Sequence, residues 1–190
     1  MKLKMELLSD TVFGNGMSVP GGEDTSVLND EFGFPYFKGG TFKGIFREEL
    51  ERLLEWKGME KNGIDDEMSA LLGVSGASDL ENQRKIVFSD FSLSKGVKKA
   101  VLEEIGLDKR EIVLNTLSHT RAFTSISEDG NTKDGSLRTC RCINAGLCFY
   151  STILCKPEDE VCVKEVISLI KWVGTMRNRG FGKVKITVIE

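Results

Sequence analysis

A glycine-rich turn that leads into an amphipathic helix is the feature that most constrains this chain. Gly39 and Gly40 follow an extended segment around Pro35, because the residue before a proline avoids the helical region. The pattern beyond them predicts a helix over 41–56 that begins at an N-cap, Thr41. Its apolar stripe consists of Phe42, Ile45, Phe46, Leu50, Leu53 and Leu54.

The start of this predicted helix is a candidate anion site. Unpaired backbone N–H groups and the positive end of the helix dipole gather there, and Lys38, Lys43 and Arg47 lie around it. Gly44 lowers helix stability by about 1 kcal/mol relative to alanine, so we expect a close neighbour at that position. A phosphate-bearing chain explains these features, and so does an ordinary loop-to-helix junction with solvated lysines.

Length and composition predict one globular domain over 1–190 without a membrane partner. The first residues alternate and carry charge, and no apolar run reaches the length of a membrane span, so we expect a cytoplasmic protein. The net charge of −3 argues against a free-standing nucleic-acid binder, but the segment 171–185 holds only basic charges. The odd number of cysteines, 5, and the lack of a Cys-x-x-Cys pair predict packed thiols rather than disulfides or zinc ligands.

The remaining patterns predict an α+β fold with a ferredoxin-like (RRM-like) core, insertions and a protruding hairpin. The segment 120–139 is polar and contains two Asp-Gly turns, which is typical of a long hairpin. Its Phe123 and Ile126 are candidates either for core contacts or for wedging between stacked bases. The other predicted elements are strands at 2–9, 84–93, 140–154 and 184–189, a helix at 158–173, an insertion at 57–82 that is helical near 66–72, and an ambiguous segment at 102–116 in which Ile112, Val113 and Leu114 favour a strand.

Four segments, in order, resemble motifs of the RAMP superfamily, the repeat-associated RNA-binding proteins of CRISPR effector complexes. Pro35–Arg47 is similar to the signature Pro-Tyr-x-x-Gly-[Gly/Ser]-[Ser/Thr]-x-Lys-Gly-x-x-Arg. The other three are Leu71-Leu72-Gly73 followed by Ile86–Phe91, similar to a strand element of the family; His119-Thr-Arg121 with Asn131–Leu137, similar to the thumb hairpin of the backbone subunit; and Gly174–Lys183, similar to the glycine-rich loop that cradles guide RNA.

The resemblance implies specific site residues. Asp24–Asp30, shortly before Gly33-Phe-Pro-Tyr36, is similar to the loop of the type III backbone subunit that holds a nuclease aspartate, which makes Asp24 the expected catalytic residue and the ligand of Mg²⁺ or Mn²⁺. His119 alone suggests a general base, but an RNA-stacking or structural role is also compatible with it. The expected RNA-binding residues are Lys38, Gly39, Gly40, Lys43, Arg47, His119, Arg121, Arg177, Arg179, Gly180, Gly182 and Lys183.

The function implied by the resemblance is that of a backbone subunit of a type III CRISPR effector complex. Such a subunit binds CRISPR RNA (crRNA) and cuts the paired target RNA, and its partners are crRNA, target RNA, other effector subunits and copies of itself in a head-to-tail filament. A scaffold that binds RNA without cutting it is the first alternative. The second is a metal-independent endoribonuclease that processes CRISPR repeats, which is disfavoured because Tyr36 and Tyr150, the chain's 2 tyrosines, lie in a family motif and a strand.

Overall fold

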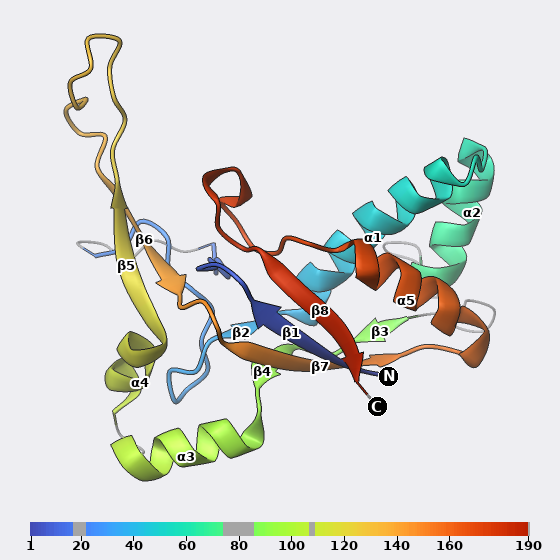
Figure 1. The fold of residues 1–190 in the computed structure, drawn as a ribbon, viewed down its shortest axis with the longest axis horizontal. Coiled ribbons are helices and arrows are strands. Elements are labelled where there is room, and N and C mark those ends of the chain that lie inside the picture. The colour runs from blue at the N-terminus through green and yellow to red at the C-terminus, as the bar shows by residue number, and fades with distance from the viewer. Residues whose placement is uncertain (17–21, 74–85, 107–108, 190) are drawn as a thin grey trace.

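An antiparallel sheet with two helices on one face forms the body of the protein (Figure 1). The computed structural model describes residues 1–16, 22–73, 86–106 and 109–189. The strands of the sheet run in the order β2-β4-β7-β1-β8, and β3 pairs with β7 beside this path. Their bounds are β1 Lys2–Leu7, β2 Tyr36–Phe37, β3 Val87–Phe88, β4 Phe91–Leu93, β7 Cys148–Leu154 and β8 Val184–Ile189.

Strand β1 lies at the centre of the sheet, as its alternating sequence predicts. Leu3, Met5 and Leu7 are buried beneath the helices, whereas Lys4 lies on the other face between Tyr150 and Thr187. The strand–helix–strand–strand–helix–strand order of β1, α1, β4, β7, α5 and β8 is the order expected of a ferredoxin-like core. The α+β class is confirmed.

Helices α1, Gly39–Trp56, and α5, Glu160–Leu169, contact each other and cover the inner face. Rings from α1 pack on rings from the sheet, with centroids 4.7 Å apart for Phe42 and Phe91 and 5.1 Å apart for Phe46 and Phe88. The expected start of α1 is wrong: Lys38 is the N-cap, and Thr41 lies inside the helix. The expected end of α5 is also wrong, because Ile170 is already extended.

Of the three further helices, only one was predicted in part. Helix α2, Lys61–Leu72, packs on α1 and lies in the expected insertion 57–82. Residues 74–82 of that insertion lie outside the described residues. The same holds for residues 84 and 85 of the strand expected at 84–93. Helix α3, Lys95–Ile105, lies where no helix was predicted, and helix α4, Arg110–Leu117, replaces the strand favoured at 112–114. That expectation is wrong because Val113 and Leu117, one helical turn apart, are the buried pair.

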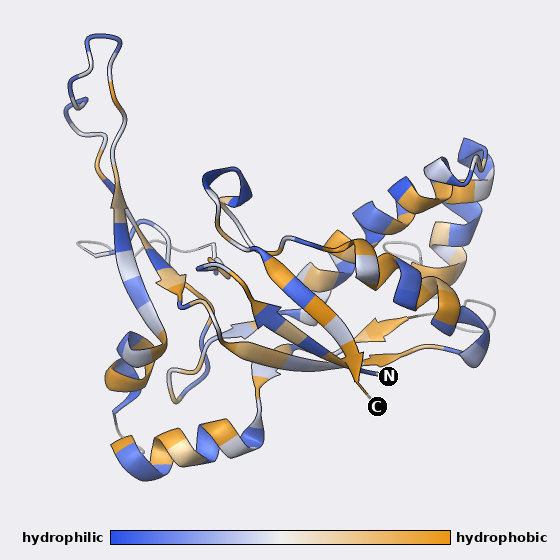
Figure 2. Cartoon of the chain, in the orientation of Figure 1, coloured by the Kyte–Doolittle hydropathy of each residue, from blue (hydrophilic) through white to orange (hydrophobic). Residues whose placement is uncertain are grey.

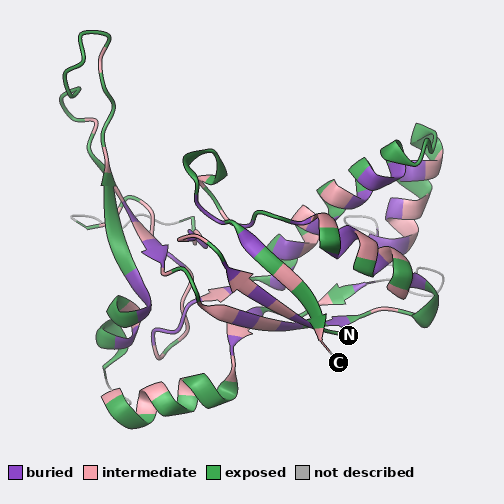
Figure 3. Ribbon diagram, viewed as in Figure 1, coloured by how far each residue is buried: buried purple, intermediate pink, exposed green. Residues whose placement is uncertain are grey.

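The predicted hairpin extends away from the body (Figure 1). Its strands β5, Ser118–Phe123, and β6, Arg138–Ile143, form a separate two-stranded antiparallel sheet. The outer part is largely hydrophilic and exposed (Figures 2 and 3). The prediction of a single strand at 140–154 is wrong, because a turn at Gly146, with φ of 86°, separates β6 from β7.

The core contains side chains from the sheet, α1, α2, α4 and α5. Cys140 and Cys142 are buried in it, and all five cysteines are free thiols. Among the described residues, no helix combines the length and apolar character needed to cross a bilayer.

Candidate nucleic-acid interface

Two of the predicted RNA-binding motifs meet at the base of the hairpin. Arg121 of β5 lies over the ring of Phe181, 5.4 Å from its centroid, and Arg179 lies over Phe123 at 5.3 Å. The two rings meet edge to face with centroids 5.9 Å apart. These four residues, which we call the Arg/Phe cluster, join the hairpin to the loop before β8. Stacking on a ring restrains a guanidinium while its N–H groups stay available to a phosphate.

A carboxylate beside this cluster orients its basic neighbours. Asp10 Oδ2 lies 3.4 Å from the guanidinium of Arg121 and 3.5 Å from His119 Nε2. Asp10 Oδ1 accepts the backbone N–H of Ala145 at 3.1 Å. His119 Nδ1 lies 2.7 Å from Asn144 Oδ1, and the amide of Asn144 is fixed by donation of Nδ2 to a backbone carbonyl. His119 and Arg121 are therefore held in place on the exposed side of β5.

The glycines of the C-terminal loop shape its backbone more than they offer free amides. Gly182 has φ of 81°, and a Cβ there would collide with the carbonyl of Val173. Its N–H donates to Asp10 O at 2.9 Å, and the N–H of Gly180 donates to Arg177 O at 3.1 Å. Of the loop residues expected to bind RNA, these two amides therefore have protein acceptors, whereas Arg177, Arg179 and Lys183 have exposed side chains.

At the start of α1, a protein carboxylate occupies the first position expected for a phosphate. The N–H of Gly39 donates to Asp90 Oδ1 at 2.8 Å. A Cβ on Gly39 would collide with the carbonyl of Phe88, so this glycine is required by packing. Gly40 faces open space instead, and Lys38 is exposed beside it. Of the two adjacent glycines, only Gly40 presents its surface to a ligand.

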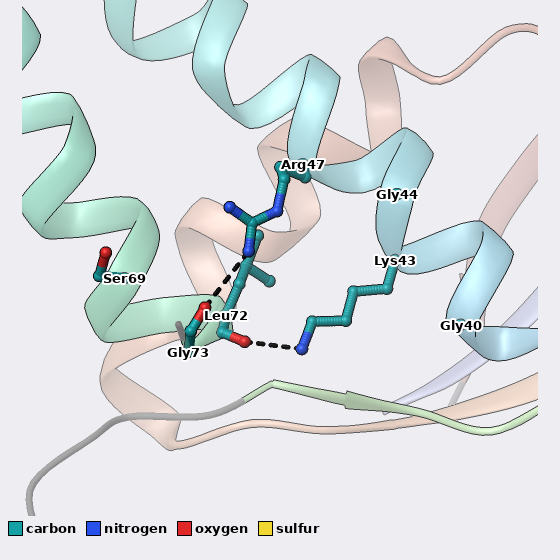
Figure 4. Close-up of a pocket in the computed structure, with 7 residues that line it drawn as sticks. All are labelled: Gly40, Lys43, Gly44, Arg47, Ser69, Leu72 and Gly73. Atoms are coloured by element: carbon teal, nitrogen blue, oxygen red, sulfur yellow. Dashed lines mark hydrogen bonds between the residues drawn. The ribbon is translucent and has the colours of Figure 1, made fainter. Parts of the chain in front are cut away.

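Lys43 and Arg47 point across a pocket of about 470 Å³ toward the end of α2 (Figure 4). Lys43 Nζ donates to the carbonyl of Leu72 at 2.6 Å, and Arg47 donates to that of Gly73 at 3.3 Å. Cations near the C-terminal carbonyls of a helix are stabilising. The two side chains therefore bind α1 to α2, and their positive charge also lines the pocket.

A second pocket, of about 240 Å³, lies on the other side of Gly44 and reaches Thr175 and Arg177. Both pockets include Gly44, so we refer to them together as the α1 groove. The close neighbour expected at Gly44 is absent from the described residues, because a Cβ there would meet nothing within 4 Å. The groove connects with the Arg/Phe cluster through the short helical turn Arg177–Arg179.

Asp24 lies on the opposite side of the hairpin from β5. Its Oδ2 accepts the backbone N–H of Thr139 in β6 at 2.7 Å, and the backbone of Asp24 is bonded to the same residue. The neighbouring Glu23 forms an ion pair with Arg141 of β6, with 2.7 Å between Nε and Oε1. These bonds attach the 22–30 segment to the hairpin, and Asp24 remains exposed.

The donors near Asp24 fit Mg²⁺ or Mn²⁺ only sparsely. In the portions of the chain that are described, no three His, Cys, Asp or Glu side chains are grouped to hold a metal ion. Asp24 Oδ2 already accepts from Thr139, which leaves Oδ1 for an ion. Mg²⁺ is commonly held by one or two carboxylates together with waters and phosphate oxygens. The site therefore suits the ion only if RNA supplies further oxygens.

Four residues of this surface escaped the reasoning from sequence: Asp10, Asp90, Asn144 and Phe181. The signal for each is weak, because an acid after a strand and an aromatic in a glycine-rich loop are common in any globular protein. Their roles depend on long-range contacts, such as that of Asp10 with Ala145 and Arg121.

The family model described as RAMP superfamily matches residues 4–185. No curated protein matches the chain in sequence. The fold is similar to a subunit of a structure described as the Type III-B Cmr-beta complex in the apo state, with a TM-score of 0.70 and 13% identity over 98% of this chain and 95% of that one. A subunit of Type III-B Cmr-beta bound to cognate target RNA is similar too, with a TM-score of 0.68 and 14% identity over 97% and 95% of the two chains. This chain belongs to the RAMP superfamily.

Proposed function

We propose that this protein is a crRNA-binding backbone subunit of a type III CRISPR effector complex and that it cuts guide-paired target RNA at Asp24. Its partners would be crRNA, target RNA, other effector subunits and further copies of itself. Membership of the superfamily and the similarity to subunits of Type III-B Cmr-beta complexes, one of them bound to cognate target RNA, support the first part.

The Arg/Phe cluster is the observation that carries the proposal. Two guanidiniums from distant parts of the chain are stacked on two rings at the base of the hairpin. Arginines restrained in this way bind phosphates with little loss of side-chain entropy. An RNA strand that follows them through Arg177 enters the α1 groove, where Gly40 and Gly44 leave room for its backbone.

The outer hairpin suits a role in separating bases. Ile126 and Leu137 are 69% and 63% exposed, although both are apolar. Phe123, the other candidate wedge, packs against Phe181 at the hairpin base and so belongs to the body. We assign the wedge to Ile126, whose backbone pairs with Thr132 across the hairpin.

Cleavage would take place at the edge of β6. Asp24 lies beside Thr139, which pairs with Ala122 between Arg121 and Phe123 on β5. The 22–30 segment and β5 lie on opposite edges of β6, so the backbones of Asp24 and Arg121 are about two strand spacings, roughly 10 Å, apart, and an RNA chain held by Arg121 would cross β6 to reach the Asp24 carboxylate. A bound Mg²⁺ would polarise the scissile phosphate and stabilise the leaving oxygen. The bond from Thr139 to Oδ2 orients the carboxylate so that Oδ1 faces away from it.

A scaffold without nuclease activity is the second candidate function, and one observation favours it. The carboxylate of Asp24 has a structural partner in Thr139, so a catalytic role is not needed to explain an aspartate at this position. The repeat-processing alternative gains no such support. Its histidine, His119, is on β5, whereas Tyr36 and Tyr150 are on strands β2 and β7 of the main sheet.

One reconstitution separates the three functions. The protein is assembled on guide RNA with its effector partners, then given labelled complementary RNA or labelled repeat precursor, each with Mg²⁺ or with EDTA. We expect cutting of the complementary RNA only, and only with Mg²⁺. Binding without cutting would favour the scaffold, and cutting of precursor in EDTA would establish the processing enzyme.

A further inference from the structure

A pocket with a tryptophan in its wall lies beside the α1 groove. Its volume is about 510 Å³, and we call it the Trp172 pocket. Three segments meet there, which are α1, the residues that follow α5 and the short helical turn before β8. Its lining includes Glu48, Glu49, Arg52, Trp172, Arg177 and Asn178.

The backbone holds Trp172 in place while its ring stays accessible. On either side of it, the N–H of Val184 donates to Lys171 O at 2.9 Å, and the N–H of Val173 donates to Gly182 O at 2.8 Å. The side chain is 37% exposed, and no other ring or cation stacks on it within the described parts of the chain. An ordered and exposed indole is a platform on which a flat ring can stack.

The polar groups of the pocket offer an unused carboxylate. Arg52 Nη1 lies 2.8 Å from Glu49 Oε1, so this acid already has a partner. Glu48 is exposed, and its carboxylate takes part in no ion pair or hydrogen bond among residues 1–16, 22–73, 86–106 and 109–189. Asn178 is exposed too, and its amide can donate as well as accept. The wall therefore presents a pair of acceptor oxygens together with separate N–H donors.

This combination suits guanine better than the other RNA bases. Guanine has two adjacent donors on its Watson–Crick edge, N1–H and N2–H, and the acceptor O6 lies next to them. A carboxylate can accept from both donors at once, and such charge-assisted pairs are strong. Adenine and cytosine place a ring-nitrogen acceptor beside their amino group, and uracil has one N–H between two carbonyls, so each of them would oppose a lone pair to the carboxylate.

We propose that the Trp172 pocket binds one guanine of the RNA strand, stacked on Trp172, with its N1–H and N2–H on Glu48 and its O6 facing Asn178. The pocket is within reach of that strand, because Glu48 and Arg177 line both it and the smaller pocket of the α1 groove. Arg177 then stands where the phosphate of the same nucleotide enters. This inference rests on the proposed function and deepens it, since it gives one position of the strand a base preference.

Free nucleotides test the pocket without the rest of the RNA. Trp56→Phe leaves Trp172 as the sole tryptophan of the 2 in the chain, and its fluorescence is followed as GMP, AMP, CMP or UMP is added. N-acetyltryptophanamide, titrated in the same way, corrects for collisional quenching and absorbance. We expect saturable quenching with a Kd for GMP that is lower by about tenfold or more than for the other three. Equal Kd values, or no saturation by GMP, would overturn the inference.

Two variants separate the carboxylate from the stacking platform. Glu48→Gln replaces one acceptor with an N–H that faces the donors of guanine, so its Kd for GMP should rise to that for AMP. Glu51→Gln, on the same helix outside the pocket, is the matched control and should keep the preference. Trp172→Ala, followed by calorimetry, should weaken binding of every nucleotide by about fivefold or more, and Trp56→Ala should not. A preference for GMP that survives in Glu48→Gln would contradict the assignment, and this exposed substitution tests it even if Trp172→Ala does not fold.

Failure of this inference can be told apart from failure of the proposed function. Fluorescence anisotropy compares a short oligouridine with the same RNA carrying one internal guanosine. We expect the guanosine to raise the affinity of wild type by about tenfold and to add nothing in Glu48→Gln. Equal binding of both RNAs by wild type would overturn the guanine pocket and leave RNA binding intact. If wild type binds neither RNA, a preference for free GMP that depends on Glu48 would support the pocket while the proposed function fails.

Discussion

Arg179, in the loop before the last strand, lies 5.3 Å from the centroid of Phe123 on the first strand of the hairpin. The contact has its counterpart in Arg121 and Phe181, so each segment gives one arginine and one ring. Two motifs that look independent in sequence therefore form one surface. Movement of the hairpin relative to the body would disrupt both stacks, and with them the surface where we propose that RNA binds.

Replacing Arg179 with alanine should weaken RNA binding to a similar extent for all sequences. A phosphate contact carries no base information, and its loss should lower the slope of log K against log salt concentration by about 1. Fluorescence anisotropy with several unrelated RNAs over a salt series measures both effects. Lys164→Ala is the control, because Lys164 pairs with Glu160 on α5 and lines neither the cluster nor the α1 groove. A changed preference among RNA sequences at unchanged affinity would contradict the assignment.

The open glycines of α1 should show opposite effects on stability and on binding. A Cβ at Gly40 or Gly44 meets nothing within 4 Å, so alanine at either position should raise the free energy of unfolding by up to about 1 kcal/mol. The same methyl group would occupy the groove where we place RNA, and affinity should fall. Urea denaturation and RNA titration of each variant measure the two quantities.

Gly39→Ala is the contrasting variant at the neighbouring position. Its Cβ would collide with the carbonyl of Phe88, so this variant should be less stable than wild type. If Gly40→Ala and Gly44→Ala gained stability without any loss of affinity, RNA would not follow the α1 groove.

Lys43 should matter for folding as well as for binding. Its ammonium donates to the carbonyl of Leu72 at the end of α2, and a hydrogen bond from a charged group contributes about 1.5–3 kcal/mol. Lys43→Met keeps the aliphatic stem and should lower the free energy of unfolding by an amount near the lower end of that range. Urea denaturation measures this change. A loss of RNA affinity without any loss of stability would show that the bond to α2 is unimportant in solution.

The sequence predicted elements where one periodicity dominates. Strand β1 alternates strictly, and α1 has an unbroken apolar stripe, so both were predicted within a few residues. Helix α4 was missed because Ile112, Val113 and Leu114 are adjacent and two of them are β-branched, which favours a strand. Tertiary packing favours a helix instead, since only Val113 of the three is fully buried in the core.

The site was predictable in its basic residues but not in their geometry. The motif resemblance pointed to Arg121 and Arg179, whereas their ring partners depend on the fold of the loop. The sequence also made Gly39 and Gly182 look like phosphate-binding amides. Both amides have protein acceptors, Asp90 and Asp10, that lie far away along the chain. Such pairings require the tertiary structure.

Alkaline pH should destabilise the protein through Cys142. Burial, with a contribution from Cys140, raises the pKa of the Cys142 thiol from 9.0 to about 12. Below pH 9 the thiol is neutral in both states, and between pH 9 and 12 it ionises in the unfolded chain alone, so stability falls as pH rises through this range. Urea denaturation in reductant from pH 7 to 10 should show the decline. Cys142→Ala should show a shallower one, and an equal slope would argue against this origin.

Asp24 gives the sharpest test of nuclease function, because its carboxylate has both a structural and a proposed catalytic role. Asp24→Asn keeps an oxygen that can accept the N–H of Thr139 but removes the charge expected to hold Mg²⁺. Asp24→Ala removes both. If the carboxylate is catalytic, both variants should lose metal-dependent cutting of target RNA while guide binding and target capture persist. Capture should even tighten slightly, because one negative charge near a phosphate is gone.

The two variants should differ in stability, and that difference distinguishes activity lost through unfolding from activity lost through removal of the catalytic group. A hydrogen bond to a charged group contributes about 1.5–3 kcal/mol, and this exposed bond from Thr139 belongs at or below the lower end of that range, so Asp24→Ala should unfold at lower urea than Asp24→Asn. Equal loss of cutting despite unequal stability would assign the loss to chemistry. Asp129→Asn, on the outer hairpin, is the matched control and should cut as wild type does.

Since each copy contributes one Asp24, fragments should recur at a fixed spacing along the target. Undiminished cutting by either Asp24 variant, or cutting by wild type in EDTA, would remove Asp24 from the mechanism and leave the hairpin base as a binding surface alone.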